Sequence, residues 1–202
     1  GEAPQLLSQW ILKLKRDPSY ADPLGCALAE VINKYWIEML TNECREIVII
    51  PVPKHTDEGE YNQALELAKA MVKRLEIRNL NVNLEPSLVV KKSPMKASER
   101  RKKCENKCKA DIECLAKCNF DEESRILEVN RKFKNTRNLC AVVIDDVRTT
   151  GATIGAIAKL LKESGIGKVF AATLARNAIK RELLKCVVPH IWEHHKYFND
   201  RS

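Results

Sequence analysis

The chain has 202 residues, of which 45% are hydrophobic and 31% charged, a composition typical of one folded domain with a core of its own. No apolar run approaches the roughly 20 residues that cross a bilayer, and the start lacks the basic region and cleavage site of a signal peptide, so we expect a cytoplasmic protein without a membrane partner. The net charge of +8 suits either a nucleic-acid-binding protein or an enzyme that acts on polyanionic phosphates.

Strands and helices alternate along the chain. We expect buried strands at Arg45–Pro53, Leu88–Val90, Leu139–Asp145 and Lys168–Leu174. We expect helices within Pro4–Lys15, from Asp22-Pro23 onward, and at Gln63–Ile77, Ala152–Glu163 and around Ile179–Lys185. The first strand, REIVIIPVP, is apolar without alternation, which is typical of a parallel strand buried on both faces. The sequence therefore predicts an α/β fold, with an open, mainly parallel sheet flanked by helices.

The second helix has the clearest start signal. Asp22-Pro23 combines an N-cap residue with a proline at the first helical position. Apolar residues then recur at three- and four-residue spacing, which predicts one buried helix face. That face would consist of Leu24, Leu28, Val31, Ile32, Tyr35 and Met39.

The clearest chemistry lies at Asp145–Thr153, where an apolar strand leads into two carboxylates, a short loop and a helix. Ligands of open α/β sheets bind at the carboxyl ends of strands, and the N–H groups that begin a helix suit a phosphate. Gly151 lets the backbone approach a ligand closely, and the threonine hydroxyls add donors. Adjacent Asp145 and Asp146 are costly beside a phosphate unless they face hydroxyl groups or a metal. A ribose diol supplies the first and Mg²⁺ the second.

The stretch DDVRTTGAT resembles the signature of the type I phosphoribosyltransferases. The resemblance implies the fold of that family, with Asp145 and Asp146 on the ribose 2′- and 3′-hydroxyls and the loop around the 5′-phosphate. The loop residues that it implicates in substrate binding are Arg148, Thr149, Thr150, Gly151, Ala152 and Thr153. Arg148 departs from the aliphatic or aromatic residue often found there, so it either adds phosphate affinity or faces solvent.

A second stretch, IPVPKHTDEGEYNQALELAKAM, resembles a segment of the ComF-like, competence-associated branch of that family. By this resemblance Pro53 and Lys54 form the loop that binds the pyrophosphate, and the YNQ turn opens the next helix near the active site. Farther on, SLVVKKSPMKASER resembles the region where the family places a basic residue against the pyrophosphate. Lys91 and Lys92 are the candidates there, and we expect Lys92.

The family resemblance implies an enzyme that uses phosphoribosyl diphosphate and Mg²⁺ to transfer phosphoribose to a small, nucleobase-like acceptor. Asp145, Asp146 and Lys54 would be its catalytic residues. Such a transfer passes through an oxocarbenium-like state, so the protein mainly positions the reactants and stabilises the departing charge. The alternative is a regulatory protein on the same fold, which senses phosphoribosyl diphosphate without turnover or associates with nucleic acid.

Four of the eight cysteines lie in CENKCKADIECLAKC as two pairs with a spacing of four: Cys104, Cys108, Cys114 and Cys118. That spacing places each pair on one helix face, and Asp111 is placed to cap the second helix. We therefore predict a Cys-rich helical hairpin over residues 93–124. The resemblance implies that it replaces part of the hood, the segment that covers the acceptor in this family. We expect it to hold an iron–sulfur cluster; a zinc ion or two disulfides, Cys104–Cys118 and Cys108–Cys114, are the alternatives.

The other cysteines, Cys26, Cys44, Cys140 and Cys186, are scattered in apolar contexts and are interpreted as core residues. The insert is also strongly basic, since RRKKCENKCK carries six basic residues against Glu105. This run is either a solvated helix face or a contact for nucleic acid. We expect one domain over residues 1–202 that includes the insert, and a homodimer is an assembly this interpretation leaves open.

Overall fold

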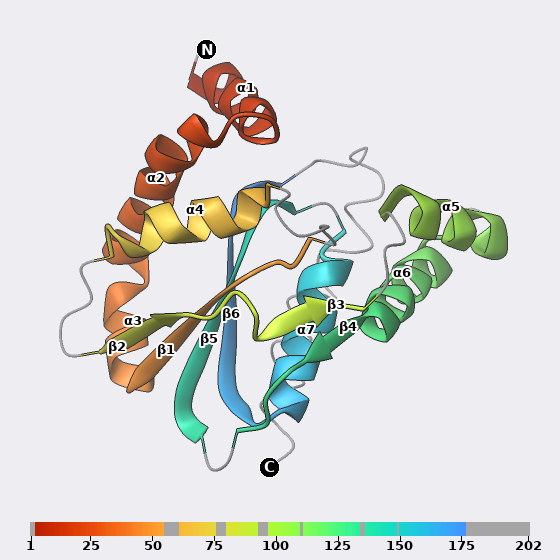
Figure 1. Ribbon diagram of the computed structural model, residues 1–202. Coiled ribbons are helices and arrows are strands. Elements are labelled where there is room, and N and C mark those ends of the chain that lie inside the picture. The colour runs from red at the N-terminus through yellow and green to blue at the C-terminus, as the bar shows by residue number, and fades with distance from the viewer. Residues whose placement is uncertain are drawn as a thin grey trace.

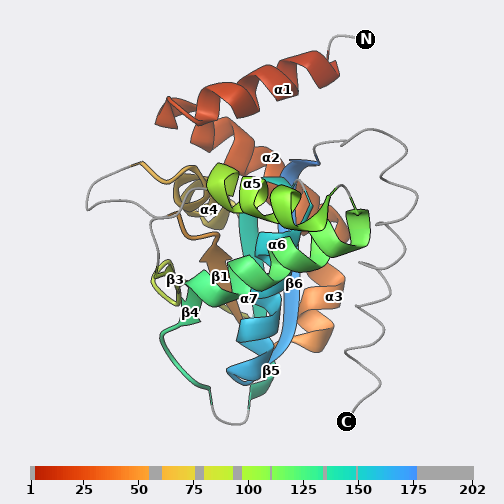
Figure 2. The same ribbon diagram turned by 90° about the vertical axis from the view of Figure 1, so that its right-hand side faces the viewer.

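The computed structural model describes residues 3–54, 61–75, 80–92, 97–109, 111–133, 136–148 and 150–176. Within these residues a parallel sheet separates two groups of helices (Figures 1 and 2). The helix expected around Ile179–Lys185 and the loop residue Thr149 lie outside the described residues. Within the described part of the chain, no helix is both long enough and apolar enough to span a membrane.

Four parallel strands form the central sheet, in the order β2-β1-β5-β6. They are β1 (Glu46–Pro51), β2 (Asn81–Leu84), β5 (Thr136–Arg148) and β6 (Ile166–Arg176). Parallel strands need long crossover connections, and α4 (Gln63–Val72) and α7 (Ala152–Glu163) supply those of the β1–β2 and β5–β6 pairs. The predicted α/β fold with a parallel, helix-flanked sheet is thereby confirmed.

The region between residues 80 and 91 differs from the prediction. Strand β2, with the sequence NVNL, was not predicted because it is short and half polar. The strand expected at Leu88–Val90 runs over Val89–Lys91 (β3). It pairs antiparallel with β4 (Leu127–Val129) in a separate two-stranded sheet beside the main one.

The sheet divides the interior into two cores. On one side, α1 (Ala3–Leu14), α2 (Ala21–Tyr35), α3 (Ile37–Glu43) and α4 pack with the alternate strand residues Ile47, Ile49, Val142 and Ile144. On the other side, α7 packs against Val48, Ile50, Ala141 and Val143. Figure 1 shows α2, α3 and α4 on one flank of the sheet and α7 on the other. Because both faces are covered, β1 and the middle of β5 are apolar without alternation.

Helix α2 begins differently from the prediction. Asp17 and Pro18 supply the cap and first-position proline of a short 3₁₀ helix, η1 (Pro18–Tyr20), and the Asp17 side chain accepts a hydrogen bond from the Ser19 N–H at 2.9 Å. Helix α2 follows without a side-chain cap, so Asp22 is not its N-cap.

On the buried face of α2, Leu24, Leu28 and Ile32 are buried as predicted, whereas Val31 and Tyr35 are 47% and 66% exposed. Small residues belong to this face as well: a Cβ on Gly25 would lie 2.6 Å from the Ala70 Cβ, so α2 and α4 approach closely there.

A disulfide joins the end of α3 to the central strand. Cys44 and Cys140 are both buried, as expected of core residues, but they are also bonded to each other, with their Cα atoms 5.8 Å apart. They lie 96 residues apart in the sequence, beside the first residue pair of β1 and β5, Glu46 and Leu139. This cross-link therefore fastens the end of the sheet that is opposite to the carboxyl ends of the strands.

Candidate functional site

Residues that are distant in the sequence meet at the carboxyl ends of β1 and β5, around a cavity of about 150 Å³. Its lining residues are Val52, Pro53, Lys54, Asn62, Gln63, Ala64, Lys91 and Asp145. The structure thus brings together Pro53, Lys54 and Asp145, three of the residues that the sequence singled out. A larger hollow of about 400 Å³ between α2 and α4 contains none of the predicted site residues.

The two adjacent carboxylates lie within strand β5, which continues through Arg148 instead of ending before them. The Asp146 N–H donates to Asp145 Oδ1 at 3.0 Å, and the Val147 N–H donates to Asp146 Oδ1 at 2.7 Å. Asp146 is only 7% exposed, and its Oδ2 atom is buried without a hydrogen-bond partner among the described residues. A buried acceptor in this state is costly unless a ligand supplies a donor or a cation.

The ionisation of Asp145 reflects its surroundings. Burial and then the Asp146 carboxylate raise the pKa of Asp145 from 3.8 to about 7. The folded protein therefore holds this proton more tightly than the unfolded chain does. By linkage, Asp145 lowers the stability of the ligand-free protein progressively as the pH rises from 3.8 to about 7.

Asp145→Asn is accordingly expected to stabilise the ligand-free protein, because it removes a charge that is buried beside another of the same sign. We expect its Tm to exceed that of the wild type by on the order of 5 °C at pH 8 and by less at pH 5, where the wild-type carboxyl is largely protonated. Scanning calorimetry at the two pH values measures the difference. A lower Tm for the variant at pH 8 would contradict the raised pKa.

The segment after β1 is tied to the start of α4. Lys54 Nζ donates to the Tyr61 carbonyl at 3.2 Å, and Asn62 Nδ2 lies 3.5 Å from the Val52 carbonyl. Asn62 Oδ1 also caps α4 by accepting from the N–H groups of Ala64 and Leu65 at 3.0 and 3.3 Å. These contacts hold Lys54 at the cavity wall.

Tyr61 packs against the core on the side of the sheet that α1 to α4 cover. Its hydroxyl is buried without a partner among the described residues. Burial and then Glu66 raise the pKa of Tyr61 to about 12, so the phenol is neutral at physiological pH and is available as a donor.

Lys91, and not Lys92, lines the cavity. Lys92 Nζ forms an ion pair with Glu128 Oε2 at 3.0 Å, on the neighbouring strand β4. Burial and then the charge of Arg100 lower the pKa of Lys91, as expected for an ammonium group held among other cations. Lys91 thus faces the cavity and Lys92 faces Glu128, since neighbouring residues of a strand point to opposite sides; which of the two contacts a diphosphate stays a prediction.

The loop between β5 and α7 has the features of an anion-binding turn. Gly151 has a positive φ of 81°, in the left-handed region, and α7 begins there without a side-chain cap. Thr150 Oγ1 accepts from the Ala152 N–H at 3.3 Å, and the Gly151 carbonyl accepts from the Gly155 N–H at 2.8 Å. The first-turn N–H groups of α7 have no intrahelical partners, so an anion can be bound there.

The Cys-rich insert is a helical hairpin of α5 (Ala97–Cys108) and α6 (Ile112–Ile126). Asp111 caps α6 as expected, since its side chain accepts from the Cys114 N–H at 3.0 Å. The four cysteines form two disulfides, Cys104–Cys118 and Cys108–Cys114. This is the pairing named as the disulfide alternative, and it does not support the iron–sulfur cluster that we expected or the zinc ion. Disulfide sulfurs carry no thiolate charge with which to bind a metal.

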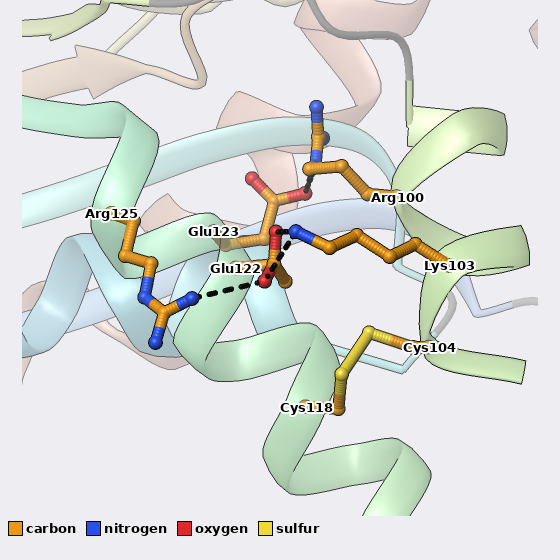
Figure 3. Close-up of polar contacts among 7 residues, drawn as sticks. All are labelled: Arg100, Lys103, Cys104, Cys118, Glu122, Glu123 and Arg125. Carbon is orange, nitrogen blue, oxygen red and sulfur yellow. Dashed lines mark hydrogen bonds and ion pairs between the residues drawn. A yellow bond between two sulfur atoms is a disulfide. The ribbon is translucent and has the colours of Figure 1, made fainter. Parts of the chain in front are cut away.

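Ion pairs fasten the base of the hairpin (Figure 3). Arg100 Nε donates to Glu123 Oε1 at 3.1 Å, and both side chains are almost fully buried. Glu122 accepts from Lys103 at 3.0 Å and from Arg125 at 3.2 Å. Since the charges of Arg100 and Glu123 both act on Lys91, the base of the hairpin lies next to the cavity wall.

Serine at all four hairpin cysteines is expected to loosen α5 and α6 without disturbing β5 and α7, because the cross-links are local to the hairpin. Closing a loop of about 15 residues stabilises a fold by about 3 kcal/mol, so amide exchange in the hairpin should accelerate by about 100-fold. Hydrogen-exchange mass spectrometry compares the two regions, with Cys26→Ser as the control. Iron and acid-labile sulfide in anaerobically purified protein, with these four thiols reactive, would contradict the disulfides.

The residues of the site could hold Mg²⁺ together with a bound phosphate ligand, but not by themselves. Two carboxylates stand side by side, but the described residues contain no group of three or more His, Cys, Asp or Glu that could hold a metal by itself. Mg²⁺ is commonly bound by one or two carboxylates together with substrate phosphates and waters. The unpaired Oδ2 of Asp146 is the available oxygen.

Comparisons with known proteins show little. No protein-family model and no curated protein matches the chain. Among solved structures, a hypoxanthine phosphoribosyltransferase from Staphylococcus aureus matches with a TM-score of 0.41 and 12% sequence identity. The match covers 75% of this chain and 64% of that chain, so this chain spans less than two thirds of that protein's length. Similarity at this level assigns the chain to no family.

Proposed function

We propose that the protein is a phosphoribosyltransferase, which transfers phosphoribose from phosphoribosyl diphosphate to a small acceptor. The observation that supports this most is the carboxylate pair at Asp145 and Asp146, whose unpaired buried oxygen lies just before the uncapped start of α7. A ribose phosphate complements both features, because its hydroxyls donate to carboxylates and its phosphate accepts from helix N–H groups.

The chemistry requires little covalent help from the protein. The bond between C1 of the ribose and the diphosphate oxygen breaks, and the diphosphate leaves with the electron pair. A nitrogen of the acceptor forms the new bond to C1 and releases its proton to solvent. Asp145 and Asp146 orient the ribose through its diol, and the ammonium groups of Lys54 and Lys91 stabilise the departing charge. Mg²⁺, when bound with the diphosphate, would neutralise part of that charge.

The two neighbouring lysines offer a matched comparison for this assignment. Lys91→Gln is expected to weaken binding of phosphoribosyl diphosphate by about tenfold or more, because a charge-assisted contact at the cavity is lost. Lys92→Gln removes the same charge one residue away and should change affinity less than about threefold, since it breaks only an exposed ion pair with Glu128. Calorimetric titration of both variants makes the comparison. A larger loss of affinity in Lys92→Gln than in Lys91→Gln would instead assign the diphosphate contact to Lys92.

Binding and turnover test the proposal in sequence. Calorimetric titration of phosphoribosyl diphosphate, with and without Mg²⁺, should show one site per chain for which ribose 5-phosphate competes. Pyrophosphate release is then measured while nucleobases and other small nitrogen compounds are added one at a time. The absence of binding would remove the proposed function.

A regulatory protein on the same fold is the second candidate. It is favoured by two exposed lysines of α5, Lys102 and Lys107, which add positive charge to the hairpin, whereas the exposed Lys103 pairs with Glu122. Tight binding of phosphoribosyl diphosphate without pyrophosphate release for any acceptor would favour this function. Salt-dependent binding of nucleic acid, lost when these lysines are replaced by glutamine, would support it further.

A further inference from the structure

Two arginines stand side by side at the carboxyl end of the sheet. Arg148 and Arg176 are the last residues of β5 and β6, and they form the last pair in the register of these strands. Residues paired in register on adjacent parallel strands point to the same side of the sheet. The charges are close enough to interact, since burial and then Arg176 lower the pKa of Arg148.

No group in the described part of the chain neutralises this pair. Neither arginine forms an ion pair with a carboxylate there, and Arg148 Nε is buried without a hydrogen-bond partner. Asp146, two residues earlier on the same side of β5, accepts from a backbone N–H and leaves its Oδ2 unpaired. Arg148 is half-buried and Arg176 is exposed beside it, so an oxyanion bound from solvent could pair with both guanidinium groups and offset their repulsion.

The pair lies across β5 from the cavity. In the strand order β2-β1-β5-β6, the cavity with Lys54 and Lys91 lies beside the end of β1, whereas Arg176 lies on β6 (Figure 1). Arg148 packs against the loop before α7, because its Nε is 3.5 Å from the position that a Cβ on Gly151 would occupy. The arginines therefore offer an anion site separate from the one that lines the cavity.

We propose that Arg148 and Arg176 form a second anion subsite, which binds a phosphate or carboxylate group carried by the acceptor. The assignment to the acceptor rests on the proposed function. In displacement at a sugar C1 without a covalent intermediate, the nucleophile approaches the face opposite the leaving group. With the diphosphate on the β1 side, the acceptor approaches from the β6 side, where the two guanidinium groups are. The acceptor is then an anionic compound, and the planar guanidinium groups suit the oxygens of either anion.

The test uses the full chain saturated with ribose 5-phosphate. Inorganic phosphate is titrated into it calorimetrically in one arm and benzoate in the other, so that the tighter probe identifies the preferred anion. Arg176→Gln is compared with Lys168→Gln, which removes the same charge near the opposite end of β6, where Lys168 pairs with Glu43 at 2.8 Å. We expect one further anion per chain in the wild type, at least tenfold weaker binding in Arg176→Gln, and less than a twofold change in Lys168→Gln.

Three results would overturn the subsite: no second anion in the wild type, equal binding in Arg176→Gln, or displacement of ribose 5-phosphate by the added anion. The last would assign the arginines to the ribose-phosphate loop. If ribose 5-phosphate does not bind, the proposed function fails. The anions are then titrated into the ligand-free wild type and Arg176→Gln to test the subsite by itself. A tenfold loss in Arg176→Gln there still supports an anion site, and equal binding removes it.

Discussion

Asparagine at both Asp145 and Asp146 is expected to weaken binding of phosphoribosyl diphosphate by about 100-fold or more while the fold is kept. Each carboxylate would lose a charge-assisted hydrogen bond from a ribose hydroxyl, and two such bonds contribute about 3 to 6 kcal/mol together. The fold should survive because neither carboxylate forms an ion pair within the described residues. The asparagine side-chain oxygens can also still accept hydrogen bonds from the backbone N–H groups at positions 146 and 147. Calorimetric titration and circular dichroism measure the two effects.

Inorganic pyrophosphate provides the control for this double variant, because it has no diol. Its binding should be unchanged or tighter, since two negative charges are removed near the cavity. The wild-type affinity for phosphoribosyl diphosphate should also fall more steeply than that of the double variant as the pH drops below about 7, because Asp145 becomes protonated there in addition to the phosphates of the ligand. Unchanged affinity for phosphoribosyl diphosphate in the double variant would end the ribose-diol assignment.

Valine at Gly151 is expected to reduce the affinity for ribose 5-phosphate by about 10- to 100-fold. Gly151 has a φ of 81°, and a β-branched residue there is strained by more than about 1 kcal/mol, so the loop would rearrange. The added side chain would also meet the Arg148 side chain, whose Nε lies 3.5 Å from the Cβ position. The N–H groups at the start of α7 could then no longer reach the phosphate together. Titration with ribose 5-phosphate measures the loss.

Gly155→Ala is the matched control, one turn later in α7. Its φ is ordinary, and the added Cβ would only touch the Phe120 ring at 3.4 Å, so affinity should stay within about threefold of wild type. Gly151→Ala should be intermediate, because it adds the backbone strain without the branched side chain. A correctly folded Gly151→Val variant that binds ribose 5-phosphate as tightly as wild type would place the phosphate elsewhere.

The sheet was predictable where its strands are apolar runs. The segments around β1, β5 and β6 have this pattern because helices cover both faces of the sheet. Strand β2 has no such pattern, since it lies at the edge of the sheet and half of its residues are polar. The pairing of β3 with β4 brings together segments about 40 residues apart, on either side of the hairpin, and no local pattern encodes that contact.

The site was predictable as a set of motifs but not as a geometry. Asp145 and Lys54 follow apolar strands, so their meeting at one sheet edge follows from the parallel fold. The choice between Lys91 and Lys92 depends on which side of β3 faces the cavity, which its two neighbouring lysines leave undetermined. Arg176 was not among the predicted site residues, because the strand expected there, Lys168–Leu174, ended two residues before it.

The cysteines show the same limit. A spacing of four predicted that the sulfurs of the hairpin meet in one seam, but this arrangement suits a metal and a pair of disulfides equally well. The bond between Cys44 and Cys140 had no local signal, since it joins the end of a helix to a strand 96 residues later. Only the three-dimensional fold shows that these two side chains are adjacent.

The bond between Cys44 and Cys140 also changes what a broken backbone would mean for this protein. It closes a covalent ring that contains α4, both strands of the small sheet and the α5–α6 hairpin. A protease that cuts one peptide bond anywhere in that ring leaves a single molecule, whose two pieces separate on a denaturing gel only after reduction. A nicked preparation would therefore keep its α5–α6 hairpin attached and would run as one molecule on a denaturing gel without a reductant, and the added water in its intact mass would be the sign of the cut.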